Sequence, residues 1–271
     1  MTITVLTSAA GSPGVTTTAL GLTLHWPDSC LLVDADYQQA ILTGYLRAQV
    51  VTPNGLLRLI DAARISPDLR EAITRQWIEL PGDDPDGLRR RLLPGLVSAQ
   101  TSDALFKTWP AISSTLRDLS DTGIDAVVDV GRMDWRGIHP ALLEAATHVL
   151  LVTAPTLRAA GAAKWAAQRL REQASGTGDA GKLGVVLVRP PALSAEALTN
   201  AGREERGWSD REFANWFEMP VRGQVLRDAA NARVLSDGAV PGPKFAKSAY
   251  TASLSQLAQK LHHLTRQGAH R

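Results

Sequence analysis

A glycine-containing loop near the start of the chain constrains the fold more than any other stretch. Residues 10–17 read Ala-Gly-Ser-Pro-Gly-Val-Thr-Thr, after the apolar run Ile3–Leu6 and before the helix-like run Thr18–Leu22. A strand, a glycine loop and a helix that starts with paired threonines form the layout of a phosphate-binding loop, in which backbone N–H groups and the helix amino terminus receive the anion. The residues expected to line such a site are Gly11, Ser12, Gly14, Val15, Thr16 and Thr17.

Two later apolar runs end in carboxylates. Leu31–Val33 leads into Asp34-Ala35-Asp36, and the run from Ile124 reaches Asp129. Open α/β sheets bind ligands beyond the carboxyl ends of their strands, so these side chains are expected at the same edge as the glycine loop. A hydroxyl and a carboxylate can hold Mg²⁺, which suits Thr16 with Asp129. Asp34 or Asp36 would orient an attacking water.

Strand-like and helix-like stretches alternate along most of the chain. Short continuous apolar runs are typical of strands buried on both faces, and helices between them indicate parallel neighbours. We therefore predict an α/β fold with a mostly parallel, roughly seven-stranded sheet and helices on both faces. Without a repeat, long linker or composition shift, residues 1–271 are expected to form a single domain. The expected strands cover residues 2–7, 31–33, part of 88–96, 124–131, 148–152, 183–188 and 220–226.

Composition narrows the functional classes only moderately. The apolar fraction of 44% supports a substantial core, and a formal charge of +2 does not by itself indicate nucleic acid. The single cysteine, Cys30, excludes an internal disulfide and is expected to be a small buried hydrophobe. Neither a leader-like segment nor an apolar run of about 18 residues is visible, so we expect a cytoplasmic protein.

These motifs together resemble the ParA/MinD family of phosphate-loop proteins, which position plasmids, cargo or division machinery. The family loop reads Lys-Gly-Gly-x-Gly-Lys-Thr-Thr, and Leu31–Gln39 resembles the family stretch Leu-Leu-Val-Asp-x-Asp-Pro-Gln. The resemblance implies that Asp36 helps set the hydrolytic water and that Asp129 takes the metal-associated position. It further implies that Pro220–Asp228 and the stretch to Pro241 form the last strand and the adenine-side loop.

The chain departs from the family at both loop lysines. One family lysine binds phosphates within the subunit, and the other reaches across a nucleotide-sandwich dimer; Val15 and Ala10 stand at these positions. Pro13 also lacks an N–H that could bind phosphate. Losing one charge-stabilising group typically costs 10²–10³ in rate, so little hydrolysis is expected. The expected cofactor is none, or weakly bound ATP or ADP with Mg²⁺.

Three interpretations follow from the resemblance and its departures. The first is a pseudo-ATPase that acts as a binding or regulatory module and pairs with itself or with an active paralogue. The second is a divergent active ATPase with a displaced cation. The third is a DNA- or membrane-associated scaffold that uses the fold alone. Candidates for the displaced cation are Arg132, Arg158 and Lys164.

Four further stretches of the sequence are relevant to binding of a protein, DNA or membrane partner. An aromatic and basic cluster spans residues 203–217, and we expect its aromatic side chains in the core and its arginines outside. The triplet Arg89–Arg91 is expected on a solvated helix face or turn. The last helix, at about 246–265, is expected to dock on the fold and not on a membrane, because it lacks bulky aromatic side chains. Candidate DNA contacts, by the resemblance, are Arg222, Arg227, Arg233, Lys244 and Lys247.

Overall fold

Eight strands form one sheet in the computed structural model, which describes residues 2–9, 14–36, 41–49, 55–81, 87–95, 102–176, 178–190 and 208–268. The strand order is β3-β4-β2-β5-β1-β6-β7-β8, with the first strand near the centre. The strands are β1 (Ile3–Ser8), β2 (Ser29–Asp34), β3 (Ile78–Glu79), β4 (Arg90–Leu93), β5 (Ile124–Arg132), β6 (His148–Thr153), β7 (Leu183–Arg189) and β8 (Val221–Leu226).

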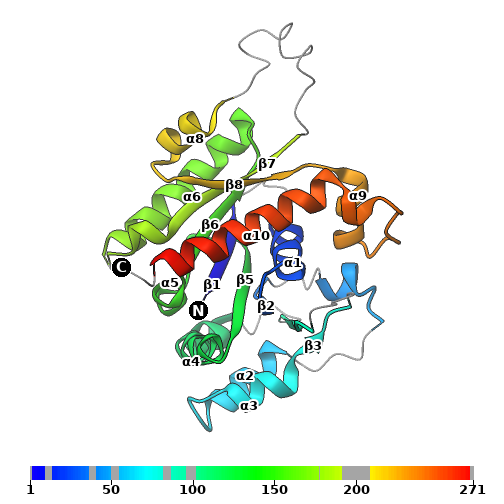
Figure 1. The fold of residues 1–271 in the computed structure, drawn as a ribbon. Coiled ribbons are helices and arrows are strands. Elements are labelled where there is room, and N and C mark those ends of the chain that lie inside the picture. Colours follow the sequence, from blue (N-terminus) through cyan, green and yellow to red (C-terminus); the bar gives the residue numbers. More distant parts are fainter. Residues whose placement is uncertain are drawn as a thin grey trace, which may run out of the picture.

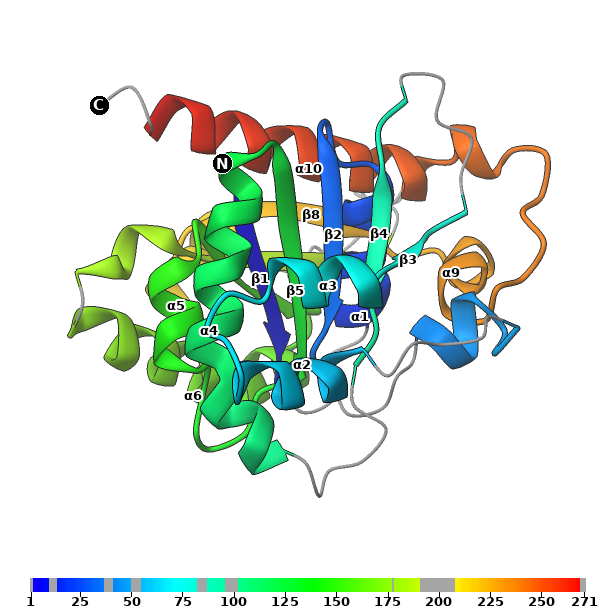
Figure 2. The same cartoon turned by 90° about the horizontal axis from the view of Figure 1, so that it is seen from below.

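Every pairing in the described sheet is parallel except β3 with β4. The crossovers between parallel strands place helices on both faces, as Figures 1 and 2 show. Each long strand therefore has two buried faces, which explains the continuous apolar runs. The expected fold class is confirmed, with the two-residue β3 added at one edge.

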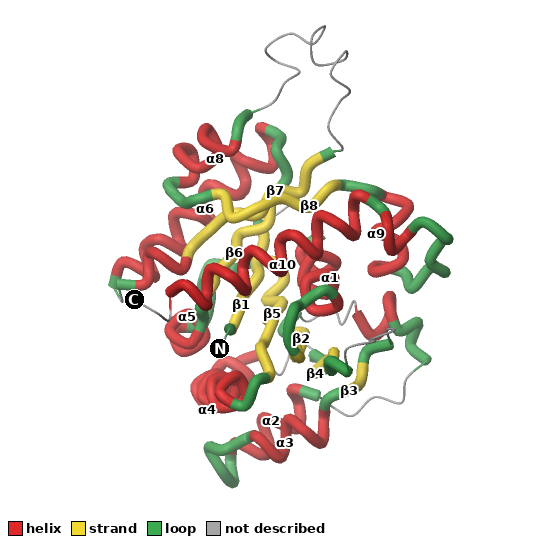
Figure 3. Tube along the Cα trace, viewed as in Figure 1, coloured by secondary structure: helices red, strands yellow, loops and turns green. Residues whose placement is uncertain are grey.

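Alternate side chains of the strands enter two separate apolar clusters. Val33 belongs to the larger cluster, whereas Leu32 faces the smaller one. The larger cluster is covered by α2 (Leu56–Ala63), α3 (Arg70–Gln76), α4 (Ser102–Asp121), α5 (Pro140–Ala145), α6 (Leu157–Ser175) and α8 (Asp210–Phe217). The smaller is covered by α1 (Val15–Leu24), α9 (Ala229–Ser236), α10 (Ala249–Gly268) and the π-helical turn η1 (Ile41–Tyr45). Figure 3 distinguishes these helices from the strands and loops.

The strand expected within residues 88–96 is present as β4, but its arginines are placed differently from expectation. The triplet Arg89–Arg91 does not lie on a solvated helix face, because two of its members belong to β4. The Arg90 guanidinium donates to the backbone carbonyls of Trp26 and Asp28, and Arg91 pairs with Glu79 at 3.0 Å. These arginines thus connect β4 to the turn before β2 and to β3. A run of charges in the sequence does not by itself predict such contacts.

The carboxyl-terminal helix docks on the fold as expected. Leu254, Leu257 and Leu261 of α10 are buried in the smaller apolar cluster. None of the described helices is both long and apolar enough to cross a bilayer. Cys30 is likewise buried, and burial raises the pKa of its thiol. The expected helix near residues 194–201 lies outside the described residues.

Candidate functional site

The expected site residues that the structure describes gather at the carboxyl edge of the central strands. Strand β5 lies between β1 and β2, and Asp34 is the register partner of Asp129. Gly14 and the first turn of α1, which come after β1 in the chain, lie beside the same edge, where Thr16 neighbours Asp129. Gly11, Ser12 and the lysine-equivalent Ala10 lie outside the described residues.

Gly14 begins helix α1 in a conformation that suits glycine. Its φ is +82°, and a side-chain carbon there would lie 2.9 Å from the Thr17 hydroxyl. That hydroxyl donates to the Gly14 carbonyl at 3.0 Å. As in any α-helix, the first N–H groups of α1 have no acceptor inside the helix, and such N–H groups attract anions.

Asp34 and Asp129 form a pair of buried carboxylates. Both residues are 0% exposed. One oxygen of Asp129 accepts from the Gly131 N–H at 2.9 Å, but the other, together with both Asp34 oxygens, lacks a hydrogen-bond partner of normal geometry among the described residues. Unpaired buried carboxylates are costly when ionised, so the pair favours a proton or a cation.

The environment of this pair raises the pKa of both carboxyl groups. Burial, followed by the nearby Asp129 and Asp36 carboxylates, raises the pKa of Asp34 well above its ordinary value. Burial raises the pKa of Asp129 to about 6, although the Thr16 side chain and the Gly131 N–H oppose the rise. Thr16 and Asp129 are therefore neighbours, as a shared magnesium site requires.

Asp36 lies against the end of β5. Gly131 has a φ of +67°, and a side-chain carbon there would lie 2.6 Å from the Asp36 carboxylate. The Gly131 carbonyl also accepts a hydrogen bond from the Thr7 hydroxyl at 3.1 Å. Glycine suits this position because of the positive φ and because a side chain there would crowd Asp36.

Val15 lies where the resemblance places the phosphate-binding lysine. Its side chain is only 8% exposed and belongs to the apolar cluster that includes Leu20 and Val152. An isopropyl group offers neither charge nor hydrogen bond to a phosphate. In this chain the position contributes to the core beneath the first turn of α1.

A cavity of about 170 Å³ opens beside that turn. Its apolar lining comes from the ends of β7 and β8 and from α9, and its polar lining includes Thr17 and Asp228. A mainly apolar lining with a few polar groups is typical of small-molecule sites. The apolar lining residues are Val188, Val225, Leu226, Ala229 and Ala232.

Sequence reasoning missed two features of this cavity. Tyr250, at the start of α10, forms part of its wall, and burial raises the pKa of its phenol to about 12. Helix α9 was not anticipated; Asp228 begins it by accepting from the N–H groups of Ala230 and Asn231. An aspartate followed by alanines is a helix-start signal that would have found α9.

Two of the candidate basic residues contact other parts of the chain. Lys164 Nζ lies 3.9 Å from the centre of the Trp216 ring, as expected for a cation–π contact. Arg222, a candidate DNA contact, donates to the Gly181 carbonyl at 2.7 Å. Phe213 and Phe217 are buried as expected, whereas Trp216 is 37% exposed. Of the arginines in the cluster at residues 203–217, Arg211 is exposed as expected, and Arg203 and Arg206 lie outside the described residues.

Comparison with known proteins identifies the fold but no family by sequence. The chain matches neither a family model nor a curated protein. Among solved structures, it is similar to MinD in the MinC:MinD cell division complex of Aquifex aeolicus, with a TM-score of 0.66 and 15% identity over 97% of this chain and 96% of that one.

Two further structures extend the same similarity. A ParA family ATPase from Chlorobium tepidum has a TM-score of 0.63 and 14% identity, covering 95% of this chain and 98% of that one. A complex of McdA with ATP from Cyanothece has a TM-score of 0.67 and 15% identity, covering 97% and 96%. At these identities the comparison shows a common fold.

Proposed function

We infer that this chain is a single-domain, ParA/MinD-like positioning or partitioning protein whose ATP hydrolysis is lost or strongly reduced. The observation that carries this proposal is the buried Val15 at the position of the phosphate-binding lysine. Phosphoryl transfer depends on cations that neutralise charge in the transition state. A valine packed in the core cannot supply that charge.

The buried acids belong to the same site. Asp34 and Asp129 are register partners at the ends of β2 and β5. In a hydrolytic site, cations hold phosphates beside such carboxylates. With both lysine positions occupied by Val15 and Ala10, we expect the rate to fall by at least about 10³ relative to a complete site.

Weak nucleotide binding is compatible with the residues present. The first turn of α1, Thr16 and Asp129 would hold phosphate and Mg²⁺, and the cavity beside Tyr250 would hold the base. Val15 does not supply the positive charge that a lysine at this position would offer to phosphate. We propose that affinity for ATP or ADP is low and comes mainly from the base.

A protein partner fits this function better than a catalytic cycle does. One structural neighbour is the MinC:MinD cell division protein complex of Aquifex aeolicus. We propose that this chain likewise acts through a protein, either a second copy or an active relative. Of the candidates for the two other interpretations, Lys164 contacts the Trp216 ring and Arg222 donates to the Gly181 carbonyl.

The proposal is tested by measuring binding and hydrolysis separately. With Mg²⁺ and millimolar ATP, we expect phosphate release at the background rate and the same rate in Asp36→Ala. Isothermal titration should show weak binding to ADP and ATP alike. Hydrolysis that Asp36→Ala abolishes would establish an active enzyme and refute the proposal.

A further inference from the structure

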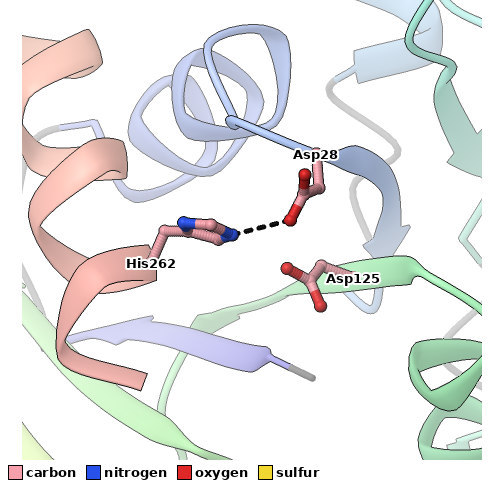
Figure 4. A group of neighbouring side chains, drawn as sticks. All are labelled: Asp28, Asp125 and His262. Atoms are coloured by element: carbon pink, nitrogen blue, oxygen red, sulfur yellow. Dashed lines mark hydrogen bonds and ion pairs between the residues drawn. The ribbon is translucent and has the colours of Figure 1, made fainter. Parts of the chain in front are cut away.

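The far end of α10 is tethered at the edge of the sheet opposite the candidate site. Asp28, in the turn before β2, accepts from His262 Nε2 at 2.7 Å and from Arg266 at 3.1 Å. Figure 4 shows the Asp28–His262 contact beside Asp125. On the same stretch of helix, His148 Nε2 lies 3.0 Å from the Leu261 carbonyl. The last turns of α10 are thus held from two elements.

Asp28, Asp125 and His262 have the composition of a metal site, since their ligand atoms lie within 4.8 Å of one another. Their hydrogen bonds favour another interpretation. Asp125 Oδ1 accepts from the Thr2 N–H, and its Oδ2 accepts from the Trp26 indole at 2.9 Å. The Arg266 guanidinium also forms an ion pair with Asp28. We therefore interpret the cluster as an ion-pair tether whose carboxylates already have protein donors.

The middle of α10 is packed closely against two other elements. A side-chain carbon on Gly21 of α1 would lie 2.6 Å from Leu254, and one on Gly223 of β8 would lie 2.7 Å from Leu257. The absence of side chains on these two residues lets α10 approach both α1 and the sheet. Movement of the helix axis would therefore disturb both contacts.

The near end of α10 borders the candidate site. Tyr250 lines the cavity beside Gly14 and Thr17. Three residues later, Ser253 Oγ accepts from the Leu226 N–H at 3.0 Å, which joins α10 to the carboxyl end of β8. One continuous helix therefore contacts the cavity at its first turn and the Asp28 tether near its end.

We propose that α10 is a coupling element that links the Asp28–His262–Arg266 tether to the Tyr250 wall of the cavity. Tight packing at Gly21 and Gly223 makes the helix dock as one unit, so weakening the tether loosens the wall at the opposite edge. The tether thereby acts as a positioning device for the cavity. This coupling is independent of whether the cavity binds a nucleotide.

Hydrogen exchange tests the coupling in the full-length protein. In Asp28→Ala, we expect exchange to rise about fivefold across residues 249–257 as well as 259–267, because a charge-assisted contact of modest strength is lost. His263→Ala, on the exposed face of the same helix, serves as the control and should leave both segments unchanged. A rise confined to residues 259–267 would mean local fraying and would overturn the proposal.

Two further measurements address the wall and the metal alternative. In ¹³C-tyrosine NMR, the pKa of Tyr250 should fall from about 12 towards its ordinary value in Asp28→Ala and not in His263→Ala. Gly223→Ala, which crowds Leu257 in the middle of α10, should raise exchange at both ends of the helix; no change at either end would contradict coupling. Thermal stabilisation by Zn²⁺ that disappears in His262→Ala would overturn the tether in favour of a metal site.

Discussion

Asp129→Asn should stabilise the protein at pH 7.5 in magnesium-free buffer by about 2 kcal/mol. The folded state raises the pKa of Asp129 from 3.8 to about 6, mainly through burial. At neutral pH the folded protein therefore carries an ionised carboxylate that it accommodates poorly. Asparagine has nearly the same shape and can accept the Gly131 N–H, but it carries no charge.

The pH dependence has a definite sign. A carboxyl group with a raised folded pKa binds its proton more tightly in the folded state, so it favours folding most below the unfolded pKa. Stability should fall as pH rises from about 4 to about 6, by about 3 kcal/mol for a shift of about two units. Asp129→Asn should remove its part of this slope, and the stabilisation should shrink towards pH 4.

Urea unfolding at several pH values, with EDTA present, measures both effects. Asp121→Asn, an exposed substitution at the end of α4, is the matched control and should change stability by less than about 0.5 kcal/mol. Destabilisation of Asp129→Asn at pH 7.5 would show that the buried carboxylate is compensated. Stabilisation of the wild type by Mg²⁺, lost in Asp129→Asn, would identify the compensating cation.

The positions of Asp34 and Asp129 could be predicted from the sequence because each follows an apolar run. Parallel strands bring their carboxyl ends to one edge, and the structure places these two residues in register. The same logic located the start of α1 at the glycine loop. The sequence pattern could not predict that both carboxylates are buried, because their burial depends on which side chains cover them.

Features that depend on long-range packing were missed for a physical reason. Strand β3 has only two residues, too few for a period, and Arg91 helps hold it through Glu79. Tyr250 reaches the cavity only because α10 packs across α1, more than 200 residues earlier in the chain. Local patterns carry no information on such contacts.

Val15→Lys should increase the affinity for Mg²⁺-ATP by about 10- to 100-fold. A lysine at this position would supply a charge-assisted hydrogen bond to phosphate, worth about 1.5–3 kcal/mol. The substituted residue would lie in the first turn of α1, at the edge that holds Asp34 and Asp129. Removing the valine from the core should lower the free energy of unfolding by about 1–2 kcal/mol.

Binding and stability must be measured on the same samples, with two comparison variants. Val15→Met has a long side chain without charge and should bind ATP no better than the wild type. Val15→Lys combined with Thr16→Ala should lose the part of the gain that depends on Mg²⁺, because Thr16 neighbours Asp129.

The result of this substitution decides how much of a nucleotide site the chain retains. A gain specific to lysine would mean that the α1 terminus, Thr16, Asp129 and the cavity already have the geometry to bind nucleotide. A folded Val15→Lys variant with unchanged affinity would mean that the loop itself no longer accepts phosphate. In that case Pro13, which cannot donate an N–H, becomes the next position to restore.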